Sequence, residues 1–232
     1  MNSPLRAAVI VFPGSNREGD VARALRQASG KPPALVWHYD RTLPEGTDLV
    51  VLPGGFSYGD YLRCGAIAGR ARIMDAVRAH AARGGLVLGI CNGFQILCEA
   101  GLLPGVLVRN AGRRFVCKMQ HLRVETITTR FSRGYSLGET IKGAIAHGEG
   151  NYIADAEALA EIEQSGRVAF RYCDHSGRVG GAANPNGSMN DIAGIYSERF
   201  NVLGLMPHPE NLIDPLVGGV DGLPMFTALT AA

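Results

Sequence analysis

Cys91 lies at the junction between an apolar segment and a segment with helical spacing, and a glycine stands two residues away on each side. The residues before it, Leu86–Ile90, are apolar as in a buried strand, whereas Phe94 and Leu97 after it recur with a helical period. G-x-C-x-G between a strand and a helix is the thiol form of the G-x-S-x-G turn, which holds a nucleophile clear of a sheet. The pattern therefore indicates nucleophilic chemistry at this thiol.

The flanking glycines, Gly89 and Gly93, fit this geometry because side chains at both positions would collide across so tight a turn. A helix N-terminus also favours the thiolate, and the N–H group of Asn92 would face whatever the sulfur attacks. The alternative is a buried cysteine that only packs beside a helix start. Nucleophilic catalysis further requires a base.

Of the six histidines, His208 has the surroundings of a base. It follows the apolar segment Val202–Met206, is flanked by two prolines and precedes Glu210 by two residues. Residues i and i+2 of an extended segment face the same way, so the carboxylate can fix the imidazole tautomer and stabilise its cation. The alternative is an exposed histidine in a proline-rich turn. Four other histidines are expected to be solvated: His38, His80, His121 and His175.

Two adjacent glycines, Gly54 and Gly55, follow the apolar segment Leu49–Leu52. Glycines in this place let the backbone approach a ligand and offer N–H groups to an oxyanion. A turn without a ligand is the alternative. A phosphate-binding loop is not indicated, because neither G-x-x-x-x-G-K nor G-x-G-x-x-G occurs.

An α/β fold is expected to position these residues. Apolar segments alternate with helical patterns over the first hundred residues, which predicts βαβ crossovers and a mainly parallel, helix-flanked sheet. Residues 106–145 are more typical of a smaller antiparallel region, with His121–Thr129 the clearest strand. We expect a single domain over residues 1–232. The other predicted elements are strands at Ala7–Phe12, Leu35–Tyr39, Val168–Tyr172 and Ile192–Tyr196, and helices at about 18–28, from Ile67 past Ala81, from Asn92 and at about 225–230.

Composition narrows the classes of partner. The net charge of +2 and the lack of a basic run indicate neither nucleic acid nor a membrane surface, and no segment is long and apolar enough to span a bilayer. Five cysteines without C-x-x-C spacing or an export signal predict reduced thiols and a cytoplasmic location. No metal site is expected.

Seven stretches carry a resemblance to a known family. "GICNGFQIL" with a distant "PHPE" resembles the class I, triad-type glutamine amidotransferases, whose fold is flavodoxin-like. More narrowly, residues 7–227 resemble the glutaminase subunits of phosphoribosylformylglycinamidine synthase, in purine biosynthesis. The stretches are "VFPGSN", "PGGFSYGDYLRCGAIA", "CNGFQIL", "RFVCK", "AHGEGNY", "NPNGSMNDIAGI" and "GLMPHPE".

The resemblance implies roles for individual residues. Cys91 would be the nucleophile, His208 the general acid and base, and Glu210 its orienting partner. The backbone N–H groups of Gly55 and Asn92 would form an oxyanion hole. Four further residues would contact the substrate: Gly54, Phe56, Gln95, which would hold its amino-acid end, and His147.

The implied activity is hydrolysis of L-glutamine to glutamate and ammonia through a glutamyl thioester. The ammonia would pass to a large synthetase subunit that converts formylglycinamide ribonucleotide and ATP to formylglycinamidine ribonucleotide, with a small third subunit in the complex. No ATP-binding element remains unassigned in this chain, so no cofactor is expected in it, and ATP and Mg²⁺ are expected in the partner.

Two other functions stay open at this point. The chain could be the glutaminase half of another synthetase, for purine nucleotide, pyrimidine or anthranilate synthesis, although "GGFSYGDYLR" and "HGEGNY" argue against it. It could also be a non-catalytic stress or redox protein with a sensor thiol. Such a protein has no need of the distant histidine–glutamate pair.

Overall fold

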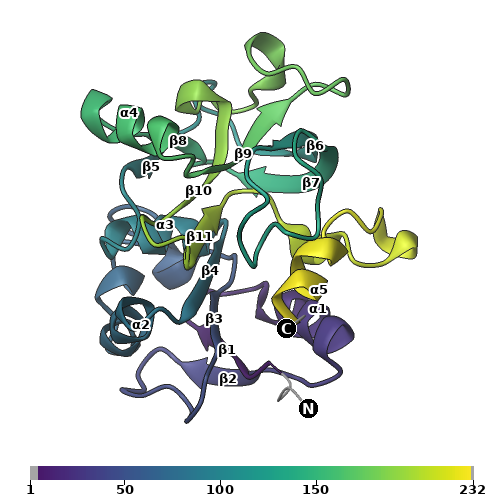
Figure 1. The fold of residues 1–232 in the computed structure, drawn as a ribbon. Helices are drawn as coiled ribbons and strands as arrows, with labels where there is room; N and C mark the ends of the chain where they lie inside the picture. Colours follow the sequence, from purple (N-terminus) through teal and green to yellow (C-terminus); the bar gives the residue numbers. More distant parts are fainter. Residues whose placement is uncertain (1–4, 231–232) are drawn as a thin grey trace.

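A nine-stranded sheet with the order β2-β1-β3-β4-β11-β10-β9-β6-β7 runs through the computed structural model, which describes residues 5–230 (Figure 1). The first five strands in this order pair in parallel, and the remaining four continue the same sheet with antiparallel pairing. The predicted fold class is confirmed, and the antiparallel strands extend the parallel sheet.

The parallel half has the strand order of flavodoxin-like proteins, in which ligands bind beyond the carboxyl ends of the strands. Its central strands β1, β3 and β4 are apolar and buried, as expected for a sheet covered on both faces. The five strands are β1 (Ala7–Val11), β2 (Ala34–Trp37), β3 (Leu49–Leu52), β4 (Leu86–Ile90) and β11 (Val202–Leu205).

Helices cover both faces of the parallel half. Helices α1 (Glu18–Ser29) and α5 (Leu223–Thr230) lie side by side on one face. Helices α2 (Ile73–Ala82) and α3 (Asn92–Glu99) cover the other face (Figure 1). None of the helices within residues 5–230 combines the length and the apolar character that crossing a membrane requires.

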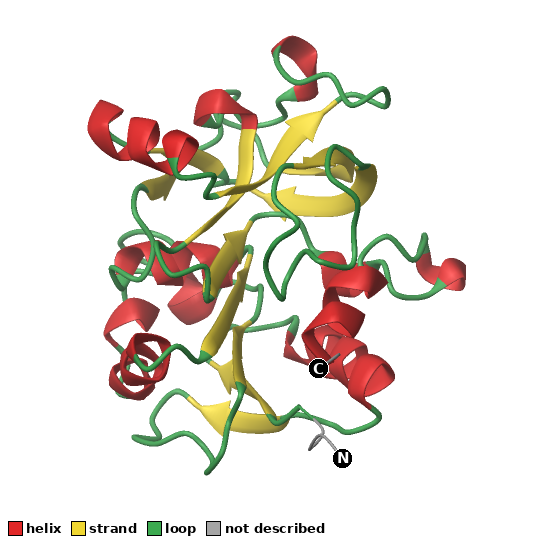
Figure 2. Cartoon of the chain, in the orientation of Figure 1, coloured by secondary structure: helices red, strands yellow, loops and turns green. Residues whose placement is uncertain are grey.

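The antiparallel half begins at β10 and ends at the edge strand β7 (Figure 2). A separate two-stranded sheet, β5 with β8, lies near α4. The elements are β5 (Val106–Val108), β6 (Val116–Val124), β7 (Thr140–His147), β8 (Asn151–Ile153), α4 (Ala156–Gln164), β9 (Val168–Cys173) and β10 (Ile192–Tyr196). Short 3₁₀ segments lie at Ser57–Asp60, Ala68–Arg70, Gly181–Ala183, Met189–Asp191, Pro209–Asn211 and Pro215–Val217.

Three expectations about elements need correction. The strand expected over His121–Thr129 ends at Val124, where the chain leaves the sheet. The helix expected from Ile67 begins at Ile73, because a 3₁₀ turn and an extended residue, Ala71, precede it. Helix α4 was not expected at all, although Asp155 caps it by accepting a hydrogen bond from the N–H of Ala158 at 2.8 Å.

The register of the parallel strands brings the ends of β3, β4 and β11 to one edge of the sheet. Leu52 of β3 pairs with Gly89 of β4, and Leu205 of β11 pairs with Ile90 of β4. Helix α3 begins directly after β4 and packs on β3, so that the Cα of Gly93 faces the carbonyl of Leu52. A side chain at position 93 would overlap this backbone oxygen.

We therefore expect Gly93→Ala to lower the free energy of unfolding by about 1–3 kcal/mol, the usual cost of overpacking a core. Gly19→Ala is the matched control: Gly19 is also the second residue of its helix, and a Cβ there meets nothing within 4 Å. That variant should gain up to about 1 kcal/mol from helix propensity. Urea denaturation measures both, and equal stability of the two variants would contradict the close approach of α3 to β3.

Candidate active site

Cys91 occupies the turn between β4 and α3 in a conformation that side chains rarely adopt, with φ 51° and ψ −105°. Such a residue stores roughly 1–3 kcal/mol of backbone strain and persists only where its surroundings impose it. Here the Cys91 N–H donates to the carbonyl of Leu205 at 2.8 Å, and its carbonyl accepts from the N–H groups of Phe94 and Gln95. The strand–turn–helix geometry predicted from G-x-C-x-G is present.

The glycines on either side of Cys91 are required by contacts around the turn. A Cβ on Gly89 would lie 2.7 Å from the carbonyl oxygen of Gly93 and 2.5 Å from Leu97 Cδ1. Gly93 abuts β3, as described above. The turn therefore tolerates no side chain at either position.

His208 lies beside Cys91 and is itself bound to Glu210. Its Nδ1 is 2.7 Å from Oε1 of Glu210, and the two residues are only 3% and 0% exposed. The backbone N–H of His208 donates to the carbonyl of Ala144 at 2.8 Å, which fixes the segment against β7. The structure thus brings together the three residues that the sequence predicts as a triad.

The charges around His208 favour its cationic form. Burial by itself would lower the pKa of His208, but the Glu210 carboxylate and the Cys91 sulfur, which also hydrogen-bonds to the ring, raise it well above the ordinary value. Oε2 of Glu210 is buried and has no hydrogen-bond partner within residues 5–230, so the imidazole is the only group that this carboxylate engages. Such a pair is costly to break, since removing one partner leaves a buried charge.

Two backbone N–H groups near the sulfur have no hydrogen-bond acceptor in the described part of the chain. The Gly55 amide lies between two hydrogen bonds, Asn16 N–H to Gly54 O and Phe56 N–H to Gly14 O, and has no acceptor of its own. The Asn92 amide is at the first position of α3 and is likewise free, as helix-start amides are. Gly55 has φ 147°, and a Cβ there would lie 2.8 Å from the carbonyl oxygen of Gly14, so only glycine fits.

A cavity of about 450 Å³ opens beside Cys91, within the size range of small-molecule sites. Five of the residues predicted from the sequence line it: Gly55, Phe56, Cys91, Gln95 and His147. Gly54 instead lies against the imidazole, since a Cβ on it would be 2.7 Å from His208 Cε1.

Gln95 is held rigidly at the cavity wall. Its Nε2 donates to the carbonyl of Glu149 at 2.7 Å, and its Oε1 accepts from Asn92 Nδ2 at 2.8 Å. One N–H of the side-chain amide is left for a ligand.

His147 is 3% exposed, and one of its ring nitrogens has no hydrogen-bond partner within residues 5–230. Its Nδ1 is 3.2 Å from Oδ1 of Asn110, whose own amide nitrogen donates to the carbonyls of Arg114 and His147. Nδ1 is therefore assigned as the protonated nitrogen, and Nε2 is a buried acceptor with no donor among the described residues. Burial, with a smaller effect from His208, lowers the pKa of His147 to about 4.

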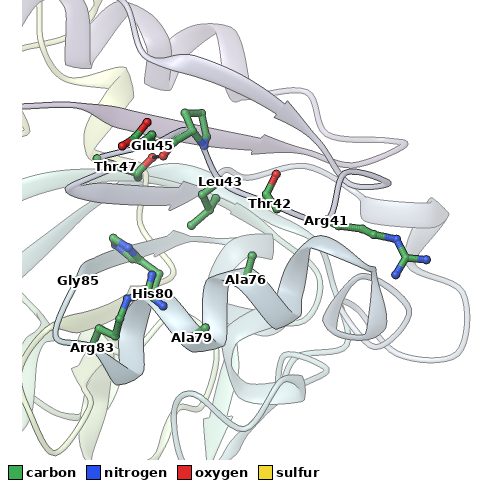
Figure 3. Close-up of a pocket in the computed structure, with 12 residues that line it drawn as sticks. Arg41, Thr42, Leu43, Glu45, Thr47, Ala76, Ala79, His80, Arg83 and Gly85 are labelled. Carbon is green, nitrogen blue, oxygen red and sulfur yellow. Dashed lines mark hydrogen bonds between the residues drawn. The ribbon is translucent and has the colours of Figure 1, made fainter.

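A larger cavity of about 610 Å³ lies between α2 and the loop of residues 41–47 (Figure 3). This loop precedes β3, and Gly85 of the same cavity precedes β4, so the cavity is at the amino ends of strands whose carboxyl ends carry Gly55 and Cys91. It contains none of the predicted site residues. It does contain His80, which was expected to be solvated but is buried, with Nε2 3.2 Å from the carbonyl of Leu86.

Comparison with known proteins places this chain in a family. A family model described as a CobB/CobQ-like glutamine amidotransferase domain matches residues 4–218. A relative from Nitrobacter winogradskyi, "Phosphoribosylformylglycinamidine synthase subunit PurQ", is 61% identical over 98% of this chain and 97% of its own. The protein of the same name from Rhodopseudomonas palustris is 63% identical, with 97% of each chain covered. The chain belongs to the PurQ family of glutamine amidotransferases.

A solved structure agrees with this membership. A chain in the "Structure of PurLQS from Thermotoga maritima" is 41% identical and superimposes with a TM-score of 0.87 over 98% of both chains. The family expected from the seven sequence stretches is confirmed. Neither a non-catalytic thiol protein nor the glutaminase of another synthetase fits this result.

The structure adds residues that the sequence reasoning did not single out. Asp60, Cys64 and Glu149 line the cavity together with three arginines, Arg109, Arg113 and Arg114. Asp60 and Glu149 lie within the stretches "GGFSYGDYLR" and "HGEGNY". Their position in these stretches is the sequence signal that could have identified them. No group of three His, Cys, Asp or Glu side chains in the described part of the chain is placed to hold a metal ion.

The lowered pKa of His147 predicts a loss of stability in acid. Because this pKa is about 4 in the folded chain and about 6.5 when unfolded, the unfolded state binds more protons between these values. Stability therefore falls as the pH falls from about 6.5 towards 4. Between about pH 7.5 and pH 5 the histidine accounts for a loss of about 2 kcal/mol in the free energy of unfolding.

Urea denaturation at both pH values tests this. The His147→Gln variant should lose about 2 kcal/mol less on acidification than the unaltered chain. His175→Gln, the same substitution at an exposed residue, should follow the unaltered chain. Parallel acid dependence of His147→Gln and the unaltered chain would show that His147 is not held neutral by burial.

Proposed function

We propose that this chain is the glutaminase subunit of phosphoribosylformylglycinamidine synthase and hydrolyses L-glutamine with Cys91, His208 and Glu210 as catalytic residues. The observation that carries the assignment of residues is the strained Cys91 thiol at a helix start, in contact with a buried histidine that is bound to a buried carboxylate at 2.7 Å. The names of the relatives supply the identity of the complex.

The first half-reaction forms a thioester. The Cys91 thiolate, paired with the imidazolium of His208, attacks the carboxamide carbon of glutamine, and the carbonyl π electrons move to oxygen. The free N–H groups of Gly55 and Asn92 are the donors for this oxyanion, and losing one such donor typically costs a factor of about 10²–10³ in rate. As the oxyanion collapses, His208 protonates the leaving nitrogen, and ammonia departs.

In the second half-reaction the same groups hydrolyse the thioester, with His208 now acting as the base. Neutral His208 takes a proton from water, whose oxygen attacks the thioester carbonyl, and the C–S bond breaks to release glutamate and the Cys91 thiolate. Glu210 binds Nδ1 throughout, so that the other ring nitrogen faces sulfur and substrate. The carboxylate orients the ring and stabilises its positive charge.

The remaining predicted residues contribute to substrate binding. Gln95 offers a spare amide N–H, and His147 and Phe56 also line the cavity, with the Phe56 N–H engaged by the carbonyl of Gly14. Gly54 acts indirectly, because its lack of a side chain lets the imidazole approach the loop.

The complex supplies the rest of the reaction. We take the chain as one cytoplasmic domain that passes ammonia to a large synthetase subunit, which binds ATP and Mg²⁺ and converts formylglycinamide ribonucleotide to formylglycinamidine ribonucleotide, with a small third subunit present. The continuous nine-stranded sheet supports the single-domain interpretation. The reduced state of all five cysteines agrees with the compartment.

The test is product formation by the reconstituted complex with each of two nitrogen sources. A complex carrying Cys91→Ala should lose glutamine-dependent product formation by a factor on the order of 10⁴ or more, as removal of a nucleophile does. It should still form product from added ammonium salt at high pH, because the synthetase chemistry takes place in the partner.

Cys98→Ala is the matched control, since Cys98 lies on the same helix, α3, with its sulfur against the carbonyl of Pro104. It should keep both activities. Loss of both activities in the Cys91→Ala complex would show that Cys91 serves assembly, and equal losses in the two variants would remove the case for a nucleophile at position 91.

A further inference from the structure

The segment of residues 55–62, which begins at an oxyanion donor, holds an unusual backbone conformation. Three of its residues other than glycine have positive φ values: Tyr58 at 53°, Asp60 at 55° and Leu62 at 70°. Aspartate tolerates this left-handed region, but large side chains such as that of tyrosine rarely adopt it. A conformation of this kind persists only where the surroundings impose it. The contacts of Tyr58 show what imposes it here.

The side chain of Tyr58 is anchored to the turn that follows β2. Its hydroxyl lies 2.5 Å from Nδ1 of His38, and the two rings stand at 87° with their centroids 5.4 Å apart. His38, which was expected to be solvated, is half-buried, and burial lowers its pKa against the opposing charge of Asp40. A neutral imidazole accepts a hydrogen bond at one nitrogen, so the hydroxyl is assigned as the donor and Nδ1 as the acceptor.

His38 is itself held by the parallel sheet. Its N–H donates to the carbonyl of Val11 at 2.9 Å, which continues the pairing of β1 with β2 by one residue. Phe12, which follows β1 and is 2% exposed, packs against both rings, with centroids 6.4 Å from His38 and 6.5 Å from Tyr58. The hydrogen bond from Tyr58 therefore ties the segment to the ends of two strands.

The backbone between Tyr58 and Gly55 is held by hydrogen bonds, so a shift at one residue is passed to the other. The N–H of Tyr58 donates to the carbonyl of Pro13 at 2.6 Å, and the N–H of Ser57 donates to Oδ1 of Asn92 at 3.1 Å. The N–H of Gly55, in contrast, has no acceptor in the described part of the chain, and it is a donor assigned above to the oxyanion.

The Tyr58 hydroxyl is the only side-chain group of residues 54–59 that makes a hydrogen bond within residues 5–230, because Oγ of Ser57 is buried without a partner. Removal of the hydroxyl takes away the contact that holds position 58 in its strained conformation, and the segment would relax. The Gly55 N–H would then be displaced. Donors to an oxyanion act only when they are correctly placed, and small displacements of catalytic groups are costly.

We propose that Tyr58 and His38 are positioning residues that hold the Gly55 N–H in place for the oxyanion of the glutamine reaction. The inference rests on the proposed glutaminase function and extends it to the turn after β2. Neither side chain lines the cavity beside Cys91. Both therefore act through the backbone of the segment and not on the substrate.

The first test is the Tyr58→Phe variant, which removes the hydroxyl and keeps the ring, in the complex with the synthetase. We expect kcat for L-glutamine to fall by a factor on the order of ten with KM unaltered, since the oxyanion is absent from the ground state. The loss is smaller than the factor of about 10²–10³ for a missing donor, because the N–H is displaced and not removed. Tyr39→Phe is the matched control: Tyr39 is next to His38 but 57% exposed, and kcat should not change. Product formation from ammonium salt should be unaltered in both variants.

Substitutions at His38 distinguish the hydrogen bond from packing. His38→Asn places an amide oxygen near the position of Nδ1, so this variant should keep most of kcat. His38→Leu should lose as much as Tyr58→Phe, and the double variant should lose no more than either single variant, because both substitutions break one interaction. Equal losses in His38→Asn and His38→Leu, or additive losses in the double variant, would contradict the proposal.

Alkylation by iodoacetamide separates the oxyanion from the thiolate. The Cys91 sulfur displaces iodide from a saturated carbon, so that the C–S bond forms as the C–I bond breaks and no oxyanion arises. The rate of alkylation at Cys91, followed by mass spectrometry, should be the same in Tyr58→Phe and in the unaltered complex.

Three results would overturn the positioning role while glutamine hydrolysis by the unaltered complex stands. They are an unchanged kcat in Tyr58→Phe, a change in KM alone, and equal falls in alkylation and hydrolysis, which would show damage to the thiol. Failure of the unaltered complex to hydrolyse L-glutamine would refute the proposed function and, with it, this role.

Discussion

The parallel register of three neighbouring strands is the constraint on which the site depends. Leu52, Ile90 and Leu205 end β3, β4 and β11 at one edge of the sheet, because the strands pair residue for residue along their lengths. Gly55, Cys91 and His208 follow these ends by three, one and three residues. A slip of one residue in either pairing would turn the strand's side chains to the opposite face and separate the imidazole from the sulfur.

Close packing converts this register into a reactive geometry. The turn at Cys91 holds an unfavourable conformation because the Leu205 carbonyl binds its N–H, while Gly89 and Gly93 leave room for Leu97 and Leu52. Strain of this kind persists where the surroundings over-determine it, which is a common feature of catalytic residues.

The neighbouring charges then separate the roles of two equally buried histidines in the same region. Both are 3% exposed, but His208 faces the Glu210 carboxylate and the Cys91 sulfur, which raise its pKa, whereas His147 faces a neutral amide and has a pKa of about 4. One histidine can therefore carry a positive charge at neutral pH, whereas the other is neutral, with Nδ1 donating to Asn110 and Nε2 left as an acceptor. The environment of each ring, and not its residue type, sets the chemistry it can perform.

Local pattern was sufficient for the elements that carry the nucleophile. The bounds of β3, β4 and β10 were predicted to the residue, because short apolar segments bounded by turn residues are distinctive. The spacing of His208 and Glu210 also predicted their pairing, since Glu210 is at position i+2 from His208.

Contacts between distant segments could not be predicted in this way. Asp60 and Glu149 line one cavity although almost ninety residues separate them, and no periodicity encodes that proximity. His80 was expected to be solvated because its neighbours in sequence are unremarkable, yet tertiary packing buries it below Leu86. Helix α4 was missed because its one buried residue, Ile162, gives only a weak apolar face.

Covalent trapping shows most directly whether the strained thiol of Cys91 is the group that attacks glutamine. The complex is treated with a diazoketone analogue of glutamine, and the adducts on all five cysteines are located by mass spectrometry. We expect one adduct, on Cys91, whose formation excess L-glutamine suppresses, while Cys64, Cys98, Cys117 and Cys173 remain unlabelled. An adduct on another thiol at a comparable rate, or labelling of Cys91 that glutamine does not suppress, would contradict it.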